Sequence, residues 1–586
     1  MSARELITEH LDLWTSAVTQ KSTRGRGSSG KIELTGIKRL RELILELAIQ
    51  GKLVEQAPDE GTALELLDSI CSEKNTQVKA KKFRNPKELP KVEAPEHPYS
   101  IPKNWEYCRL NDIGIWGAGA TPKRGNSQYY NGQIPWFKSG ELADDFIAVS
   151  EESITKLAVK ETSVRMNSPG DVLIAMYGAT IGKASILEVA GTTNQAVCAC
   201  TSWSEISNRF LLLLLKTYRP RFIAMGAGGA QPNISREKII GTVIGLPPER
   251  EQHRIVQKVD ELMALCDRLE QQTSDQLEAH ETLVDTLLGT LTQSKNATEL
   301  ADNWARLAAH FDTLFTTEQS IEKLKQTTLQ LAVMGRLVEQ DESDEPASEF
   351  IKMLEIKKQE FSRESKQRKT KPLPPIEESE GPFRLPPGWL LSRLDDITDI
   401  QGGIAKGKKL SGKKMRSLPY LRVANVQRSS LDLSVIKDIE IAENEVERYL
   451  VHPRDLLITE GGDWDKVGRT AIWDGSINLM AHQNHVFRAR LILDEQNERW
   501  LERYLNSQFA RDYFASSSKQ TTNLASINKT QLRSCTIPLP PLEEQARIVQ
   551  KVDELMALCD RLKECLNQAS KTRCQLAEAV VEKALN

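Results

Sequence analysis

The longest regular pattern of apolar residues in the chain lies in two segments, residues 249–292 and 542–585. In each segment apolar side chains recur at spacings of three and four, the periodicity of an amphipathic helix with coiled-coil character. The expected packing face consists of Val259, Leu262, Cys266 and Leu269, continued by Leu283 and Leu287, in the first segment, and of Val552, Leu555, Cys559 and Leu562 in the second. We therefore predict two long helices that pack antiparallel through these positions.

The two helical segments are copies of one another, because RIVQKVDELMALCDRL occupies residues 254–269 and again 547–562. Two further passages repeat at an offset of 284 residues: LAIQGKLVEQ (47–56) as LAVMGRLVEQ (331–340), and IPKNWEYCRLNDI (101–113) as LPPGWLLSRLDDI (385–397). Repeats of this kind determine the architecture of a chain. We expect a tandem duplication with pseudo-twofold symmetry.

The duplication divides the chain into constant and variable parts. The variable parts mix short strand-like runs, such as DVLIAMYG and DLLITEGG, with glycine-rich turns, which is typical of α/β or α+β domains. The predicted order is an N-terminal extension (1–36), a helical constant region with a linker (37–97), a first variable domain (98–248), a central constant region (249–381), a second variable domain (382–541) and a final long helix (542–586). The predicted fold is therefore two α/β (α+β) domains joined by two long antiparallel helices.

The composition is that of a globular protein with several domains, since the 586 residues are 39% hydrophobic and 27% charged, with a net charge of −3. No apolar run reaches the roughly 18 residues of a membrane span, and the five leucines at 211–215 favour a buried helix or strand. The nine cysteines lack any C-x-x-C spacing, which favours a reducing compartment. We expect a cytoplasmic protein.

The motifs that would indicate catalysis are incomplete. Residues 402–409, GGIAKGKK, have the spacing of a phosphate-binding loop, but Lys409 stands where Ser or Thr would bind magnesium. The sequence contains no Asn/Asp-Pro-Pro-aromatic tetrad for amino-methyl transfer and no H-E-x-x-H motif. His482 and His485 lack a matching carboxylate motif, which favours surface or DNA-contact roles over zinc binding. We predict a chain without catalytic residues, metal or cofactor of its own.

Basic and amide side chains gather at corresponding places in the two variable domains. The candidate DNA-binding residues are Lys123, Arg124, Lys138, Lys183, Asn233 and Arg236 in the first domain, and Lys406, Lys408, Lys409, Lys413, Arg422, Arg469, Asn528 and Lys529 in the second. An arginine held in place can form two hydrogen bonds to guanine, whereas flexible lysines contact phosphates. In the alternative, Lys138 and Arg422 pair with nearby acids such as Glu141, and the Asn-bearing turns cap short helices.

These features together resemble the DNA-specificity subunits of type I restriction–modification enzymes. The resemblance is carried by the duplicated LPPxxEQxRIVxKVDxLMxLCDxL helix, by LAxxGKLVxQ, and by the P-x-x-W-x-x-x-x-L-x-D/N-I passage before each variable domain. The N-terminal stretch LWTSAVTQKSTRGRGSSGKIELTGIKRLRELILELA is similar to the EcoAI-like, or type IB, subfamily.

The resemblance implies that each variable domain is a target recognition domain that reads one half of a split double-stranded DNA site. It also implies that the long helices hold the two domains apart and dock two modification subunits, and that two restriction subunits complete the complex. S-adenosylmethionine, ATP and magnesium would then be bound by those partners. The alternative is a repeat-built protein-interaction scaffold, which would confer no DNA sequence preference in a gel shift with the partner methyltransferase.

Overall fold

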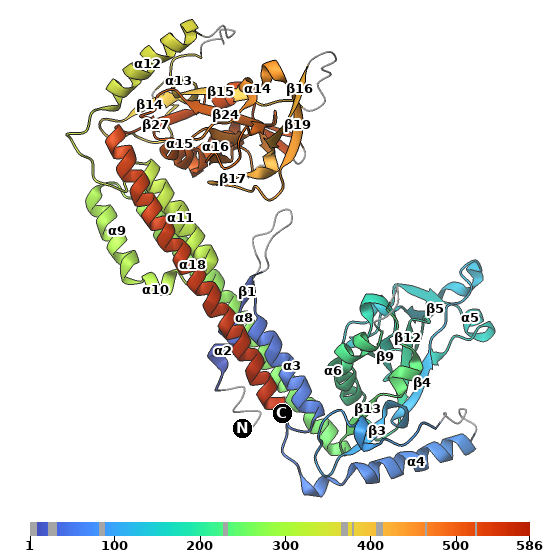
Figure 1. Ribbon diagram of the computed structural model, residues 1–586. Helices are drawn as coiled ribbons and strands as arrows, with labels where there is room; N and C mark the ends of the chain where they lie inside the picture. Colours follow the sequence, from blue (N-terminus) through green and yellow to red (C-terminus); the bar gives the residue numbers. More distant parts are fainter. Residues whose placement is uncertain are drawn as a thin grey trace. The chain divides into compact units, whose positions relative to one another are not determined.

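The structure is a computed structural model that describes residues 9–20, 32–80, 88–226, 232–364, 373–377, 380–405, 414–462, 466–521 and 524–585 (Figure 1). It divides into two compact units, one formed by Met1–Gln276 with Gln568–Asn586 and the other by Leu277–Asn567. Each unit holds one domain of sheets and helices and one helical bundle. No helix within the described ranges is long and apolar enough to cross a membrane.

Both predicted long helices are present, as α8 (Glu249–Gln293) and α18 (Leu542–Leu585). Each begins directly after a Pro-Pro pair and carries acidic side chains in its first turn, where they interact favourably with the helix dipole. In both copies a glutamine of the first turn donates its side-chain amide to a preceding proline carbonyl, Gln252 to Pro247 at 3.2 Å and Gln545 to Pro540 at 2.9 Å. The repeated sequence therefore forms the same helix start twice.

In the first unit α3 (Thr35–Ile49) packs with the first part of α8 and the last part of α18 (Figure 1). The contacts that show the helix directions are Arg41–Asp267 (2.6 Å) and Gln56–Glu251 (2.7 Å) toward α8, and Arg39–Glu578 (3.0 Å) and Lys52–Leu585 (2.6 Å) toward α18. Because α8 runs against α3 and α18 runs with it, the long helices are antiparallel in this unit.

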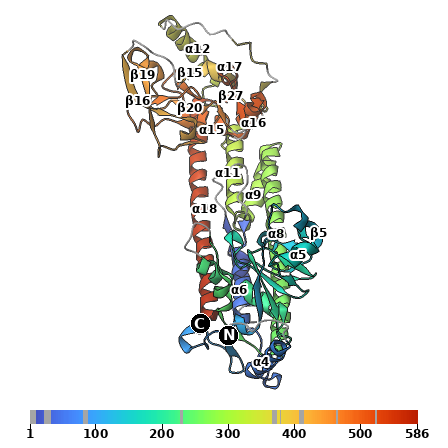
Figure 2. The ribbon, with the colours of Figure 1, turned by 90° about the vertical axis from the view of Figure 1, so that its right-hand side faces the viewer.

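In the second unit α11 (Glu318–Val333) takes the place of α3, and Figure 2 shows it beside α18. The corresponding contacts are Lys323–Glu281 (2.9 Å) and Arg336–Thr292 (3.0 Å) toward α8, and Glu322–Lys563 (3.0 Å) and Gln340–Glu544 (2.5 Å) toward α18. Here α8 runs with α11 and α18 runs against it. The two long helices have exchanged roles, as a pseudo-twofold duplication requires.

The partner of each repeated helix segment differs from the prediction. The first copy shares an apolar cluster with the last part of α18, which joins Val259, Leu262, Cys266 and Leu269 to Ala577 and Val580. The second copy shares a cluster with the last part of α8, which joins Cys559 and Leu562 to Val284, Leu288 and Leu291. Val552 belongs to the core that continues into the second domain. The predicted packing of the identical segments on each other is therefore wrong, because antiparallel helices of this length place the start of each beside the end of the other.

The two copies of one leucine provide a matched test of this packing. Leu262 is buried, whereas Leu555, in the same sixteen-residue sequence, is half-buried and belongs to no apolar cluster of the described residues. We expect Leu262→Ala to lower the free energy of unfolding by roughly 2–5 kcal/mol, the cost of emptying a buried leucine site. Leu555→Ala should cost clearly less in parallel thermal unfolding. Equal losses would contradict the burial seen here.

The N-terminal extension contributes a short helix that has a counterpart in the second unit. α2 (Leu11–Ser16) and α10 (Phe311–Leu314) both begin at a histidine with nearly the same backbone angles, φ −115° and ψ 23° at His10 and φ −119° and ψ 18° at His310. Trp14 of α2 is buried against the cluster around α3, and Leu314 of α10 is buried against the cluster around α11. The duplication therefore reaches into the N-terminal extension, which packs as part of the first bundle.

Each variable domain is closed at its base by the repeated passages that flank it. β3 (Glu106–Arg109) pairs antiparallel with β13 (Val243–Leu246), and β14 (Leu390–Arg393) with β27 (Thr536–Leu539). The first strand of each pair follows the repeated tryptophan, and the second leads into Leu-Pro-Pro. The repeated sequences thus hold the two ends of each domain together.

The first domain contains two sheets, ordered β4-β12-β9-β10-β6 and β7-β5-β11-β8, whose pairs are antiparallel except for β10 with β6 and β11 with β5. The strands are β4 (Gly114–Ala118), β5 (Tyr130–Phe137), β6 (Phe146–Ile147), β7 (Glu152–Ile154), β8 (Met166–Asn167), β9 (Val172–Ala175), β10 (Ala184–Leu187), β11 (Gly191–Thr193) and β12 (Val197–Ser202). The helices are α5 (Lys156–Glu161), α6 (Asn208–Gly226) and α7 (Arg236–Ile240). The run of five leucines lies buried in α6, so the predicted buried helix or strand is a helix.

The second domain repeats this plan with sheets ordered β15-β24-β20-β22, β19-β16-β23 and β21-β26-β25. The strands are β15 (Thr398–Gly402), β16 (Met415–Leu421), β19 (Lys437–Ala442), β20 (Leu456–Thr459), β21 (Gly461–Gly462), β22 (Thr470–Ile472), β23 (Ala481–His482), β24 (Val486–Leu491), β25 (Lys519–Thr521) and β26 (Leu524–Ser526), with β17 (Val426–Gln427) and β18 (Ser430–Leu431) forming a small hairpin. Its helices are α13 (Leu394–Ile397), α14 (Val446–Tyr449), α15 (Glu498–Asn506), α16 (Gln508–Ser517) and α17 (Lys529–Arg533). The remaining α-helices of the described residues are α4 (Ala63–Lys79), α9 (Ala297–Ala309) and α12 (Ala347–Glu364). The predicted class of two α/β (α+β) domains with two long antiparallel helices is confirmed.

Candidate nucleic-acid interface

A short turn connects β11 to β12 in the first domain and β23 to β24 in the second; we call it the central turn, residues 193–197 and 482–486. Four of its backbone hydrogen bonds recur in both domains. In the first domain they are Asn194 N to Phe137 O (3.0 Å), Ala120 N to Thr193 O (3.0 Å), Met176 N to Ala196 O (2.8 Å) and Val197 N to Asn194 O (3.1 Å). In the second they are Gln483 N to Leu421 O (2.9 Å), Ile404 N to His482 O (2.9 Å), Glu460 N to His485 O (2.9 Å) and Val486 N to Gln483 O (2.8 Å).

These bonds bring three loops of each domain to the central turn. The loops follow β4, β5 and β9 in the first domain and β15, β16 and β20 in the second. The third loop is in turn bonded to the segment before the last short helix, through Ile234 N to Met176 O and Ile527 N to Glu460 O, both at 2.9 Å. The candidate residues within the described ranges, which are far apart along the chain, lie on these same segments or at the start of the short helix that follows. The structure therefore gathers them around one turn in each domain.

In the first domain Arg124 and Lys138, two cations beside the central turn, are held by acids. Arg124 pairs with Glu152 at 2.6 Å, and Lys138 lies 2.7 Å from Glu151 and 3.3 Å from Glu152. The hydrogen bond from Arg124 lowers the pKa of Glu152, and the bond to Glu151 raises the pKa of Lys138. Lys138 also lies 3.7 Å from Glu141. The alternative in which Lys138 pairs with nearby acids is thus the arrangement in the structure.

The guanidinium of Arg124 also lies over two aromatic rings, 5.0 Å from the centroids of both Tyr130 and Trp136. A planar cation stacked in this way keeps one orientation, which suits directional hydrogen bonding. Its neighbour Lys123 is exposed and has no side-chain partner within the described ranges.

Arg422 occupies the position of Lys138 in the second domain, directly after a strand, but its partners differ. Its Nη2 donates to the carbonyl oxygen of Val435 at 2.8 Å, and its backbone N–H donates to Asn425 Oδ1 at 3.0 Å. The part of the chain that the structure describes gives Arg422 no acidic partner. Arg422 therefore braces the loop that reaches Val435, and its contact with a base stays a prediction.

The third loop of the first domain carries Lys183 at its end and lies against Asn233. Tyr177, at its start, forms an antiparallel bridge with Asn233, and both side chains are exposed. Arg236 begins α7 and lies 3.3 Å from Glu237. These candidates thus come together in space, with Asn233 free to face a ligand.

In the second domain the equivalent candidates have more structural partners. Arg469 donates to Gln427 Oε1 at 2.7 Å, and Asn528 accepts a bond from the backbone N–H of Gln531 at 2.9 Å as the cap of α17. Burial lowers the pKa of Lys529, the first residue of that helix. The helix-cap alternative therefore holds for Asn528. Lys406, Lys408, Lys409 and Lys413 lie outside the described residues.

The two histidines of the second domain differ in environment. His482 is fully buried, with its Nδ1 3.0 Å from the carbonyl oxygen of Tyr449, and burial lowers its pKa to about 4. A surface or DNA-contact role is therefore wrong for His482, whose ring is a neutral part of the core. His485 is exposed and lies 2.6 Å from Glu460. Among the described residues no group of three or more His, Cys, Asp or Glu side chains could hold a metal ion.

The sequence reasoning missed the central turn itself. Its residues read TNQAV in the first domain and HQNHV in the second. Only the final valine is shared, so no repeat signal marks the turn. Once the strands are paired, those on both sides of the turn share an offset of 289, and this places the amides of Gln195 and Asn484 at corresponding positions.

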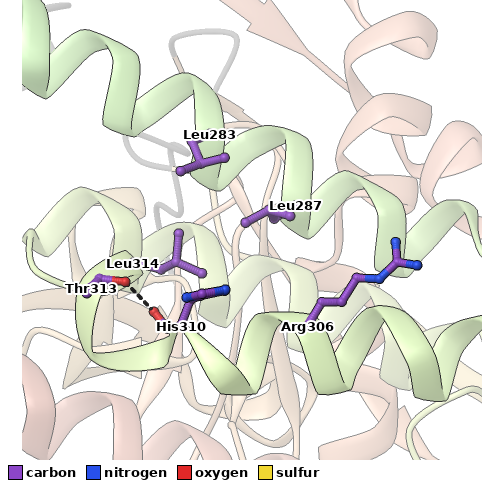
Figure 3. A pocket seen from close by; sticks show the side chains of 6 residues that line it. All are labelled: Leu283, Leu287, Arg306, His310, Thr313 and Leu314. Atoms are coloured by element: carbon purple, nitrogen blue, oxygen red, sulfur yellow. Dashed lines mark hydrogen bonds between the residues drawn. The ribbon is translucent and has the colours of Figure 1, made fainter.

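A separate pocket lies in the bundle of the second unit, between α8 and the α9–α10 pair (Figure 3). It has a volume of about 420 Å³ and is lined by Leu283, Leu287, Arg306, His310, Thr313 and Leu314. The hydroxyl of Thr313 donates to the carbonyl oxygen of His310 at 2.8 Å. None of the predicted DNA-binding residues lines this pocket, so it belongs to the helical bundle.

The chain matches the family model of the type I restriction modification DNA specificity domain twice, over residues 102–279 and 386–570. It is 37% identical to the type I restriction enzyme EcoEI specificity subunit of Escherichia coli and 37% identical to the EcoAI specificity subunit of the same organism, in both cases over 100% of each chain. A crystal structure of the HsdS subunit from Thermoanaerobacter tengcongensis covers 84% of this chain and 98% of that chain, at 20% identity and a TM-score of 0.41.

Each matched range begins just before the repeated tryptophan and ends inside a long helix, so it contains one variable domain with its closing strands. The chain therefore belongs to the type I restriction–modification DNA specificity family. Within that family, its full-length similarity to the EcoEI and EcoAI subunits confirms the predicted relationship to the EcoAI-like subfamily.

Proposed function

We propose that this chain is the specificity subunit of a type I restriction–modification complex, and that each variable domain binds one half of a bipartite double-stranded DNA site. The observation that carries the proposal is the central turn, in which four backbone hydrogen bonds recur in both domains while the side chains around them differ. A protein that reads two different half-sites needs one docking geometry and two sets of base contacts. The duplicated fold supplies the common docking geometry, and the side chains that differ between the two domains supply the two sets of base contacts.

The partners follow from the same proposal. The chain itself carries out no catalysis; two modification subunits bind S-adenosylmethionine and methylate adenine, and two restriction subunits use ATP and magnesium for cleavage. The complex acts on DNA in the cytoplasm. Support comes from the relatives, which are named as specificity subunits of type I restriction enzymes.

The proposal is tested by methylation profiling of genomic DNA from a host that carries this chain together with its modification subunits. We expect methylated adenine in one motif made of two specific halves separated by bases of any identity. The matched control is the same host carrying the modification subunits alone, which should show no such motif. A motif without a spacer, or no motif from a complex shown to assemble, contradicts the proposal.

A gel shift separates DNA recognition from the protein-scaffold alternative. The assembled complex should bind a duplex that contains the motif at least tenfold more tightly than a duplex with one half scrambled, because specific sites exceed non-specific DNA by roughly 10³–10⁷ in affinity. Measurements at two salt concentrations are needed, since phosphate contacts make affinity fall with salt. Equal affinity for both duplexes would favour the scaffold.

A further inference from the structure

The central turn combines a fixed backbone with side chains that differ between the two domains. One backbone bond from the turn to each of the three surrounding loops, and one bond within the turn, recur in both domains. At the tip, Gln195 in the first domain corresponds to Asn484 in the second. Because hydrogen bonds to several loops hold its backbone, the turn keeps its tip in one position whatever side chain the tip carries. A substitution at the tip can therefore change the ligand without moving the backbone.

A glycine under the turn in each domain makes this close packing possible. A Cβ atom on Gly119 would lie 2.2 Å from the carbonyl oxygen of Thr193, and one on Gly403 would lie 2.3 Å from that of His482. Neither distance is compatible with a real side chain. Gly119 directly follows β4 and Gly403 directly follows β15, and the two are 284 residues apart, at matching positions of the duplication. The close approach of loop and turn is therefore a common feature of the two domains.

Gln195 is exposed at the tip of the first turn, and one of its polar atoms is already oriented. The hydroxyl of Thr121 donates to its Oε1. Its Nε2 has no hydrogen-bond partner among the described residues. Because a carbonyl oxygen has two lone pairs, the amide of Gln195 still offers one acceptor and two donors. This is the group required for two parallel hydrogen bonds to adenine N6 and N7 in the major groove.

In the second domain a chain of hydrogen bonds orients the corresponding amide. Glu460 lies 2.6 Å from Nδ1 of His485, and Nε2 of His485 lies 3.3 Å from Nδ2 of Asn484. A proton on Nδ1 bonded to the carboxylate leaves Nε2 as the acceptor for the Asn484 amide. The carbonyl oxygen of Asn484 and its second amide hydrogen are then left for another partner.

We propose that Gln195 and Asn484 are base-reading residues, one for each half-site, and that Thr121 and the Glu460–His485 pair are their positioning residues. The inference rests on the proposed function and deepens it. The cations of the neighbouring loops, such as Lys123, contact phosphates and set the register of the turn in the groove. The side-chain amide at the tip of each turn fits a base edge with both a donor and an acceptor, and adenine is the base that such an amide pairs with best.

The test uses the full chain assembled with its modification subunits, and the readout is the methylated motif together with the affinity for duplexes altered at single positions. Gln195→Ala should lower discrimination at one position of one half-site by roughly 5- to 150-fold and leave the other half-site unchanged. Asn484→Ala should do the same in the other half-site. Lys123→Ala is the matched control, and it should weaken binding to all sequences alike.

The outcomes separate the two levels of the proposal. If the wild-type complex methylates no bipartite motif, the proposed function itself fails. If it does, but Gln195→Ala and Asn484→Ala leave discrimination unchanged at every position, the central turn does not read bases. His485→Ala adds an independent measurement, because loss of the positioning ring should relax the same base position as Asn484→Ala; a change elsewhere in the motif would overturn the positioning role.

Discussion

Replacement of Trp14 by alanine is expected to lower the free energy of unfolding of the first unit by roughly 3–5 kcal/mol, the usual cost of removing a fully buried aromatic side chain. Trp14 has no exposed surface and lies in the same apolar cluster as Ile37 and Leu40 of α3. A Cβ atom on Gly36 would lie 2.2 Å from the carbonyl oxygen of Trp14, so α2 and α3 are in close contact. The cavity would open where these helices meet.

Hydrogen–deuterium exchange with thermal unfolding measures this loss and locates it. Protection should fall in α3 and in the adjoining parts of α8 and α18, while α11 in the second unit keeps its protection. Leu11→Ala is the matched control, because Leu11 belongs to the same short helix but is exposed. An unchanged transition in Trp14→Ala, or equal effects from both variants, would show that the N-terminal helix is not part of the bundle.

The sequence did not reveal this helix as a repeat because the conserved signal is too short. His10 and Asp12 correspond to His310 and Asp312, but the offset here is 300, not the 284 of the passages that follow. The structural equivalence comes from the buried clusters instead, since Trp14 shares a cluster with Ile37, and Leu314 shares one with Ile321, the residue 284 positions after Ile37. The position is buried in both copies, although its residue is tryptophan in one and leucine in the other.

The long helices could be predicted because a three-and-four spacing of apolar residues specifies a helix with one buried face. The helix segments against which they pack could not be predicted in this way. The sequence extended the packing face to Leu283 and Leu287, whereas the structure buries Val284 and Leu288 and leaves Leu283 half exposed. An α-helix drifts relative to a strict seven-residue repeat, so the buried stripe moves to the next residue over several turns. Identity of sequence indicated a common role, but it did not indicate which faces meet.

The candidate interface was only partly accessible to sequence reasoning. The clustering of positive charge on matching loops predicted Arg124 and Lys138 as candidates. It did not show that Glu152 pairs with both side chains. Gln195 gave no signal, because a single amide in a variable turn has neither periodicity nor charge. Its importance follows from backbone hydrogen bonds to three separate loops, which only the fold brings together.

An exchange of residues 98–248 for the corresponding block of a relative is expected to replace one half of the methylated motif completely and to leave the other half intact. The physical reason is the closed base of the domain, where β3 pairs with β13 and returns the chain to the start of α8. Part of the core beyond that base is built from the domain's own strands, as in the cluster that joins Phe137 with Leu173 and Val197, whereas α6 shares its cluster with α3 and α8. A block exchanged at these ends carries its own recognition loops with it.

The contacts at the base decide whether such a hybrid folds. Gly245 of β13 leaves room for Ile101 and Trp105, since a Cβ atom there would lie 2.8 Å from Ile101 Cγ2. The donor block must therefore keep the glycine and the repeated tryptophan, and circular dichroism with thermal unfolding should match the wild type. The reciprocal exchange of residues 382–541 is the control and should replace only the other half-site. If one exchange altered both halves of the motif, the two domains would not read DNA independently, and the bipartite model would have to be abandoned even though the family assignment would stand on the duplicated helices.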